Sequence, residues 1–96
     1  MGVMPPLIDS EITAGLAGLA GWARAGDEIV KTFDCGTFPA AIAFVVRIGF
    51  FAERMDHHPD LDVRWKHVRV ALTTHDAGGL TNKDFDLARE IDGIGG

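Results

Sequence analysis

The stretch TFPAAIAFVVRIGFFAERMDHHP, residues Thr37 to Pro59, contains the longest helical pattern of this 96-residue chain. Thr37 is suited to cap a helix, and Pro39 is tolerated in a first turn. Apolar residues then recur with a helical period to about Asp56, and Pro59 bars the helix from continuing at His58. The stretch predicts one long helix that ends at two adjacent histidines.

The apolar side chains of this helix cover roughly two thirds of its circumference, more than the stripe of an ordinary surface helix. One sheet covers only part of so wide a face. We therefore expect the rest to meet another helix or another subunit. Arg47, Phe50 and Arg54 mark the strip that points outward.

The residues before the long helix predict a shorter helix and a β-hairpin. The hairpin prediction depends on the turn dipeptide Gly26-Asp27 and on the β-branched and aromatic residues that follow it. The expected elements are an extended lead over residues 1–8, a helix over about 11–20 capped by Asp9 or Ser10, and strands over 22–24 and 28–34.

After the histidines, a turn over 60–62 precedes the strongest strand pattern of the chain, Val63 to His75, which is long enough to predict a tight turn near Lys66. Val68, Val70 and Leu72 alternate toward the helices, whereas the other face is mixed polar. A loop over 76–79 leads to a capping pattern, Thr81 with Asp84, which opens a final helix. The tail, 93–96, is expected to fray.

The predicted order is helix, hairpin, helix, two strands, helix. This order favours an α+β domain, with a four-stranded antiparallel sheet and three helices packed on one face. No internal repeat or linker interrupts residues 1–96, so we expect a single domain.

Composition excludes several classes of function. A net charge of −5 with scattered Lys and Arg opposes nucleic-acid and membrane-surface binding. Cys35 is the only cysteine, which excludes a disulfide within one chain and a thiolate zinc site, and predicts a reducing compartment. No signal-peptide or membrane-span pattern is present, so a cytoplasmic location is expected.

Three of the four histidines, His57, His58 and His75, lie where predicted elements end. Imidazole, with an unperturbed pKa of about 6.5, donates and accepts protons near neutral pH, so the cluster is a candidate acid/base site. Solvated surface histidines and a zinc site are the alternatives, although the spacings typical of zinc ligands are missing. On spacing alone, Asp84 is more simply a helix cap, and mid-strand His67 more simply structural.

Seven residues follow a spacing known from one family: Glu53-x-x-x-His57-His58-Pro59, then Trp65 after five intervening residues, His75 after nine more and Asp84 after eight more. This spacing resembles the signature of the pterin-4a-carbinolamine dehydratases. The similarity extends from about Trp22 to Ile91.

The resemblance implies an enzyme, a 4a-hydroxytetrahydrobiopterin dehydratase and thus a hydro-lyase. It would remove water from 4a-hydroxytetrahydropterin to give the quinonoid dihydropterin, and so recycle the cofactor of aromatic amino acid hydroxylases. The chemistry implied needs no metal and no cofactor, because the pterin is itself the substrate.

The same resemblance assigns a role to each site residue. His57 and His75 would be the acids that serve the two faces of the pterin, and His58 would chiefly bind substrate. The remaining assignments are Pro59 and the segment Thr74, His75, Asp76 and Ala77 to the lining of the pocket, Asp84 to holding His75, and Glu53 to supporting His57 and His58.

The family also implies a four-stranded antiparallel sheet with three helices on one side, and a homodimer or homotetramer. Some members of the family also bind a homeodomain transcription factor as a second role. Some divergent relatives are Rubisco assembly factors that have lost the active-site residues. This chain retains those residues, which favours the enzyme.

Overall fold

The computed structural model describes residues 5–95. Its elements, in chain order, are α1 (Asp9–Ala17), β1 (Ala23–Ala25), β2 (Glu28–Asp34), α2 (Phe38–Arg54), β3 (Asp60–Arg64), β4 (His67–Leu72), a 3₁₀ helix η1 (His75–Ala77) and α3 (Asn82–Ile94). Residues 5–8 of the expected extended lead form no helix or strand, and residues 1–4 of it lie outside the described residues.

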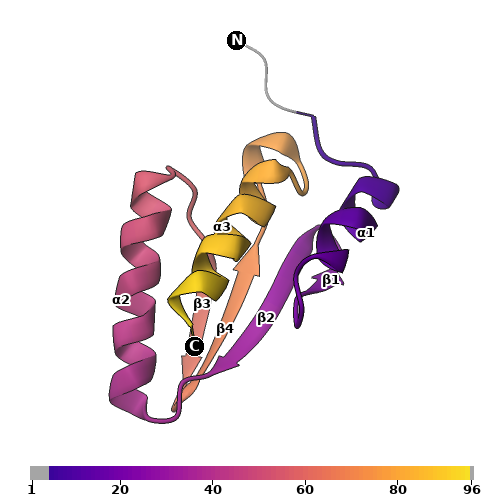
Figure 1. Ribbon diagram of the computed structural model, residues 1–96. Helices are drawn as coiled ribbons and strands as arrows, with labels where there is room; N and C mark the ends of the chain where they lie inside the picture. The colour runs from indigo at the N-terminus through magenta and orange to yellow at the C-terminus, as the bar shows by residue number, and fades with distance from the viewer. Residues whose placement is uncertain (1–4, 96) are drawn as a thin grey trace.

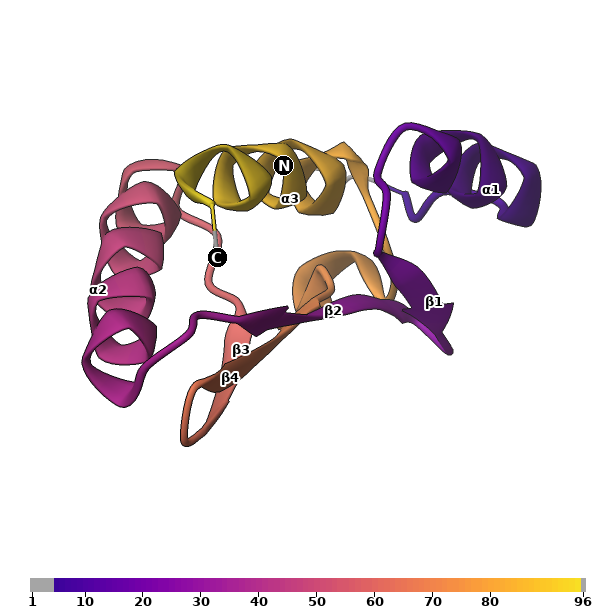
Figure 2. The ribbon, with the colours of Figure 1, turned by 60° about the horizontal axis from the view of Figure 1, so that its bottom comes forward.

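The four strands form one antiparallel sheet in the order β1-β2-β4-β3 (Figure 1). Figure 2 shows all three helices on the same side of this sheet, with α3 between α2 and α1. The predicted α+β fold is therefore confirmed.

The core lies between the sheet and the helices. Val68, Val70 and Leu72 are fully buried, as their alternation along the strand predicted. They pack in one cluster with residues of α2 and α3 such as Ile48 and Leu87. Burial of this apolar face holds α2 and α3 on the sheet and so fixes the distance between their ends.

A glycine lets α1 approach α3 closely. A β-carbon added at Gly15 would lie 2.7 Å from the ring of Phe85, which is itself buried in the core. Since that distance is shorter than a van der Waals contact allows, a larger residue would require the Phe85 ring or one of the helices to shift.

Several predicted boundaries differ from the structure. The first helix begins at Asp9, with Ile8 at the cap position, because the Glu11 carboxylate accepts the Ile8 N–H at 3.0 Å. Residues 60–62, predicted as a turn, belong to β3. The tight turn predicted near Lys66 does form, and it places β3 directly opposite β4.

The C-terminal helix is also longer than predicted. Gly93, expected to fray, lies inside α3, which continues to Ile94. Gly96, the last residue of the tail, lies outside the described residues. No helix found in residues 5–95 is long and apolar enough to cross a membrane.

Candidate active site

The end of α2 fixes the backbone of His57. The N–H of His57 donates to the carbonyl of Ala52 at 3.0 Å, and the N–H of Asp56 donates to that of Glu53 at 3.1 Å. Asp56 has a left-handed φ of 51°. This is a Schellman motif with aspartate in the usual glycine position. It ends the helix at Arg54, two residues before the predicted end, and turns the chain ahead of Pro59.

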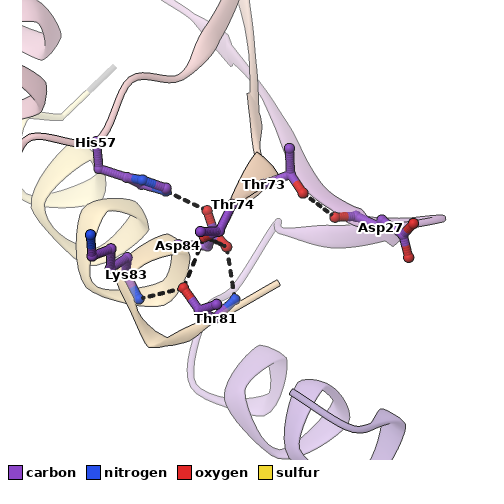
Figure 3. A network of polar contacts seen from close by, with 7 residues as sticks. All are labelled: Asp27, His57, Thr73, Thr74, Thr81, Lys83 and Asp84. Atoms are coloured by element: carbon purple, nitrogen blue, oxygen red, sulfur yellow. Dashed lines mark hydrogen bonds and ion pairs between the residues drawn. The ribbon is translucent and has the colours of Figure 1, made fainter. Parts of the chain in front are cut away.

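Asp84, in the first turn of α3, lies beneath the site and is fully buried. Its Oδ2 accepts the Thr81 N–H at 2.9 Å, which forms the predicted capping box. The same oxygen accepts the Thr74 hydroxyl at 2.8 Å, and Oδ1 lies 2.6 Å from Nε2 of His57 (Figure 3). One carboxylate therefore caps a helix and also holds a histidine from another element.

The contact with Asp84 indicates which ring nitrogen of His57 carries the proton. An ionised carboxylate only accepts hydrogen bonds, so His57 donates through Nε2 and its second nitrogen, Nδ1, remains for other contacts. Nδ1 has no hydrogen-bond partner within residues 5–95, where no buried polar side-chain atom is left unsatisfied. Nδ1 therefore reaches solvent and can exchange a proton with a bound molecule.

The other two histidines are more exposed than His57. Nε2 of His58 lies 3.0 Å from Oε1 of Glu53, and both side chains are largely exposed. His75 begins η1 and is also exposed. Only His57 is thus braced by buried groups, while His58 and His75 have room to adjust to a ligand.

All three histidines line one open hollow of about 300 Å³. Its lining comes from the turn after α2, the segment after β4 and the first turn of α3: Asp56, His57, His58, Thr73, Thr74, His75, Asp76 and Lys83. A second hollow of about 300 Å³ adjoins it and shares Thr73 and His75. The pair is large enough for a small heterocyclic ligand.

One predicted contact is wrong, and another is present only in part. Asp84 was expected to hold His75, but in the structure it binds His57. Glu53 was expected to support both adjacent histidines, but the described contact is with His58 alone. Adjacent side chains point in different directions, and the left-handed turn sends His57 inward and leaves His58 outside.

The predicted site residues divide into two groups. Five of them line the hollow, as expected: His57, His58, Thr74, His75 and Asp76. Glu53, Pro59 and Ala77 are not among its lining residues. Asp84 does not line the hollow either, but it contacts His57, which does.

Sequence reasoning missed three lining residues, Asp56, Thr73 and Lys83. A signal existed for two of them. Thr73 shares the polar face of its strand with His75, and Lys83 precedes Asp84 at the start of a helix. Asp56 became part of the site only because the chain turns back there.

The competing kinds of site receive no support from the described residues. No group of three or more His, Cys, Asp or Glu side chains within residues 5–95 is placed to hold a metal ion. Burial raises the pKa of the Cys35 thiol, and the charge of Asp34 adds to the rise, which disfavours a thiolate nucleophile. His67 lies at the far end of β4, with Nε2 3.7 Å from Asp34.

Comparison with known proteins finds similarity along almost the whole chain. A family model for pterin 4 alpha carbinolamine dehydratase matches residues 5–94. A protein of Roseiflexus sp. (strain RS-1), provisionally named pterin-4-alpha-carbinolamine dehydratase, is 60% identical over 88 residues, 92% of this chain and 95% of that protein. A Chloroflexus aurantiacus protein with the same provisional name is 56% identical over 93 residues, 97% of this chain and 100% of that protein.

A solved structure has the same fold. The crystal structure of a transcriptional coactivator/pterin dehydratase from Brucella melitensis matches with a TM-score of 0.91 at 32% identity, over 95% of this chain and 99% of that chain. The family model, which matches residues 5–94, spans every segment that lines the hollow.

Proposed function

Because the chain belongs to the pterin-4-alpha-carbinolamine dehydratase family, we propose that it removes water from a 4a-hydroxytetrahydropterin to give the quinonoid dihydropterin. The observation that carries this proposal is the meeting of three histidines on one hollow, one of them braced by a buried carboxylate. Imidazole is suited to the proton transfers that dehydration requires.

The reaction needs a proton at one position and releases one at another. The hydroxyl on the pterin carbon leaves as water once an acid protonates its oxygen. The electrons come from the neighbouring ring nitrogen, which forms a double bond to that carbon. A ring nitrogen then loses a proton, so the donor can be restored from the same substrate and no net proton is consumed.

In this proposal His57 is an acid and base that works through Nδ1. Its Nε2 is occupied by Asp84 at 2.6 Å, so Nδ1 is the nitrogen left to face a substrate. The buried carboxylate keeps the ring in one orientation, with Nε2 directed to Asp84. The carboxylate of the hydrolytic triads orients its histidine in the same way.

His75 is the proposed second acid. It lines the same hollow from η1, whereas His57 lines it from the turn after α2, and the proposal is that a flat heterocycle binds between them with one face to each. His58, bound to Glu53 at the rim, is proposed chiefly to bind substrate, together with the segment from Thr74 to Asp76.

Dehydration by this route requires no metal and no cofactor, because imidazole supplies the proton directly. The purified protein is therefore expected to keep its activity after treatment with EDTA. Activity that disappears with the chelator and returns with zinc would contradict this part of the proposal.

The test of the function is the dehydration of synthetic 4a-hydroxytetrahydropterin, followed spectroscopically. His57→Ala and His75→Ala are each expected to lower the rate by about one to three orders of magnitude. His67→Ala is the matched control, since it removes the histidine that lies outside the hollow. Rates unchanged in both site variants would refute the assignment.

An interaction role is the second candidate. The Brucella melitensis relative is named as a transcriptional coactivator as well as a pterin dehydratase. In this chain α2 carries large exposed apolar side chains, among them Phe50 at 74% exposure. We propose that this face of α2 mediates self-association into a dimer or tetramer. If a variant that lacks His57 still bound a partner protein through α2, that result would favour the interaction role.

A further inference from the structure

The hydrogen bonds beneath the hollow form a chain with a defined direction (Figure 3). The Thr74 hydroxyl lies 2.8 Å from Oδ2 of Asp84, and since an ionised carboxylate only accepts, Thr74 donates its single hydrogen there. The Thr74 and Thr81 oxygens lie 2.8 Å apart. Because the Thr74 hydrogen is already used, Thr81 must donate in this contact.

This series of hydrogen bonds begins and ends at defined groups. The Thr81 oxygen accepts the backbone N–H of Lys83 at 3.3 Å, which orients its hydrogen away from that amide and toward Thr74. At the other end, Oδ1 of Asp84 is left for Nε2 of His57. The hydrogen bonds therefore run from Thr81 through Thr74 to Asp84, where His57 donates from the opposite side.

Because these groups are buried, water cannot readily take the place of a lost hydrogen-bond donor. Asp84 is 0% exposed, Thr81 is 1% and His57 is 8%. In such surroundings a hydrogen bond to a charged group is stronger than in water, and a lost donor is not readily replaced. The position of the carboxylate thus depends on the two hydroxyls.

We propose that Thr74 is a positioning residue: its hydroxyl, oriented by Thr81, holds Asp84 so that His57 keeps its proton on Nε2 and presents Nδ1 to the hollow. Thr74 also lines the hollow, but the single hydrogen of its hydroxyl is directed to Asp84, so this role is additional to any contact with substrate. The kinetic part rests on the proposed function, whereas the effect on His57 does not.

The direct test is the proton position on His57. Long-range ¹H–¹⁵N correlation spectra of the imidazoles distinguish Nε2–H from Nδ1–H, and with four histidines in the chain the His57 signals can be assigned as those missing from His57→Ala. The wild type is expected to show Nε2–H at His57. Thr74→Val, which keeps the shape and removes the hydroxyl, is expected to show a mixture of both forms, and Thr74→Ser the wild-type pattern.

The kinetic test uses the same proteins. Thr74→Val is expected to lower kcat about tenfold with KM within about twofold, the loss typical of one hydrogen bond to a charged group. Thr74→Ser should remain within about twofold of wild type. Thr32→Val is the control, because Thr32 is an exposed threonine of β2 outside both hollows. Thr74→Ala replaces Thr74→Val if the latter does not fold.

Three outcomes would overturn the proposal. The first is an Nε2–H signature that persists in Thr74→Val. The second is a raised KM with kcat unchanged, which would make Thr74 a substrate contact alone, with no positioning role. The third is a changed signature with unchanged kcat. A wild type that lacks dehydratase activity, but whose His57 signature still depends on the Thr74 hydroxyl, would refute the proposed function and leave the positioning role standing.

Discussion

At the scale of residues, Asp84 joins the end of one helix to the start of another. Its Oδ2 accepts the Thr81 amide that opens α3, and its Oδ1 lies at Nε2 of His57, just after α2. A carboxylate at the third helical position is favoured by the helix dipole and by the capping bond. The cap therefore satisfies the same carboxylate that holds His57, which explains how a fully buried aspartate is tolerated.

Replacing Asp84 tests this double role through stability. Asp84→Ala leaves the Thr81 amide, the Thr74 hydroxyl and His57 without their shared partner, and we expect it to lower the free energy of unfolding by about 2–4 kcal/mol. Asp86→Ala, an exposed change in the same helix, should stay within about 0.5 kcal/mol. Urea unfolding measures both. An equal decrease in the free energy of unfolding of the two variants would show that the contacts of Asp84 do not stabilise the fold.

At the scale of elements, the C-terminal turn of α2 decides where the histidines point. His57 is bonded through its backbone to Ala52, so its side chain is carried by the helix rather than by a free loop. The turn requires the left-handed φ of 51° at Asp56, a conformation that aspartate tolerates better than most residues. The direction of His57 thus depends on a neighbour that also lines the hollow.

A β-branched residue at Asp56 should damage this turn. Asp56→Val is expected to lower the free energy of unfolding by about 1–2 kcal/mol, because its side chain is strained at positive φ. Asp56→Asn, which tolerates the same φ, is the matched control and should unfold close to the wild type. Thermal unfolding followed by circular dichroism compares them. A Val variant as stable as the Asn variant would contradict the importance of the turn.

At the scale of the whole molecule, the sheet covers only one side of α2. Large apolar residues remain on its outer side at every fourth position: Phe38 at 50% exposure, Ile42 at 43%, Val46 at 53% and Phe50 at 74%. Side chains with this spacing lie along one side of a helix. A small domain gains stability by burying such a stripe against a second copy, which supports the proposed self-association.

Charges placed in the stripe should dissociate the assembly. The wild type is expected to be a dimer or tetramer by light scattering after size-exclusion chromatography. Val46→Glu with Phe50→Glu should give a smaller species, because unpaired carboxylates oppose burial of the interface. Thr13→Glu on the exposed side of α1 is the control. A wild type that is monomeric at high micromolar concentration would refute self-association.

The sequence by itself determined the fold class and the order of the elements, and it singled out the three histidines that line the hollow. The helical period of 37–56, the alternation at Val68, Val70 and Leu72, and the Thr81 cap depend on neighbours close in the chain, so they can be read locally. The spacing of Glu53, His57, His58, Pro59, Trp65, His75 and Asp84 indicated the family, which the comparisons confirm. Cytoplasmic location stays a prediction.

Only the tertiary structure decided which histidine Asp84 holds. His57 and Asp84 are 27 residues apart, and their 2.6 Å contact depends on how α2 and α3 pack on the sheet. In the sequence His75 is nearer to Asp84 than His57 is. The spacing gives no information on the left-handed turn at Asp56 that directs His57 inward. Side-chain direction is set by backbone geometry and packing between distant elements, and no local pattern of residues contains that information.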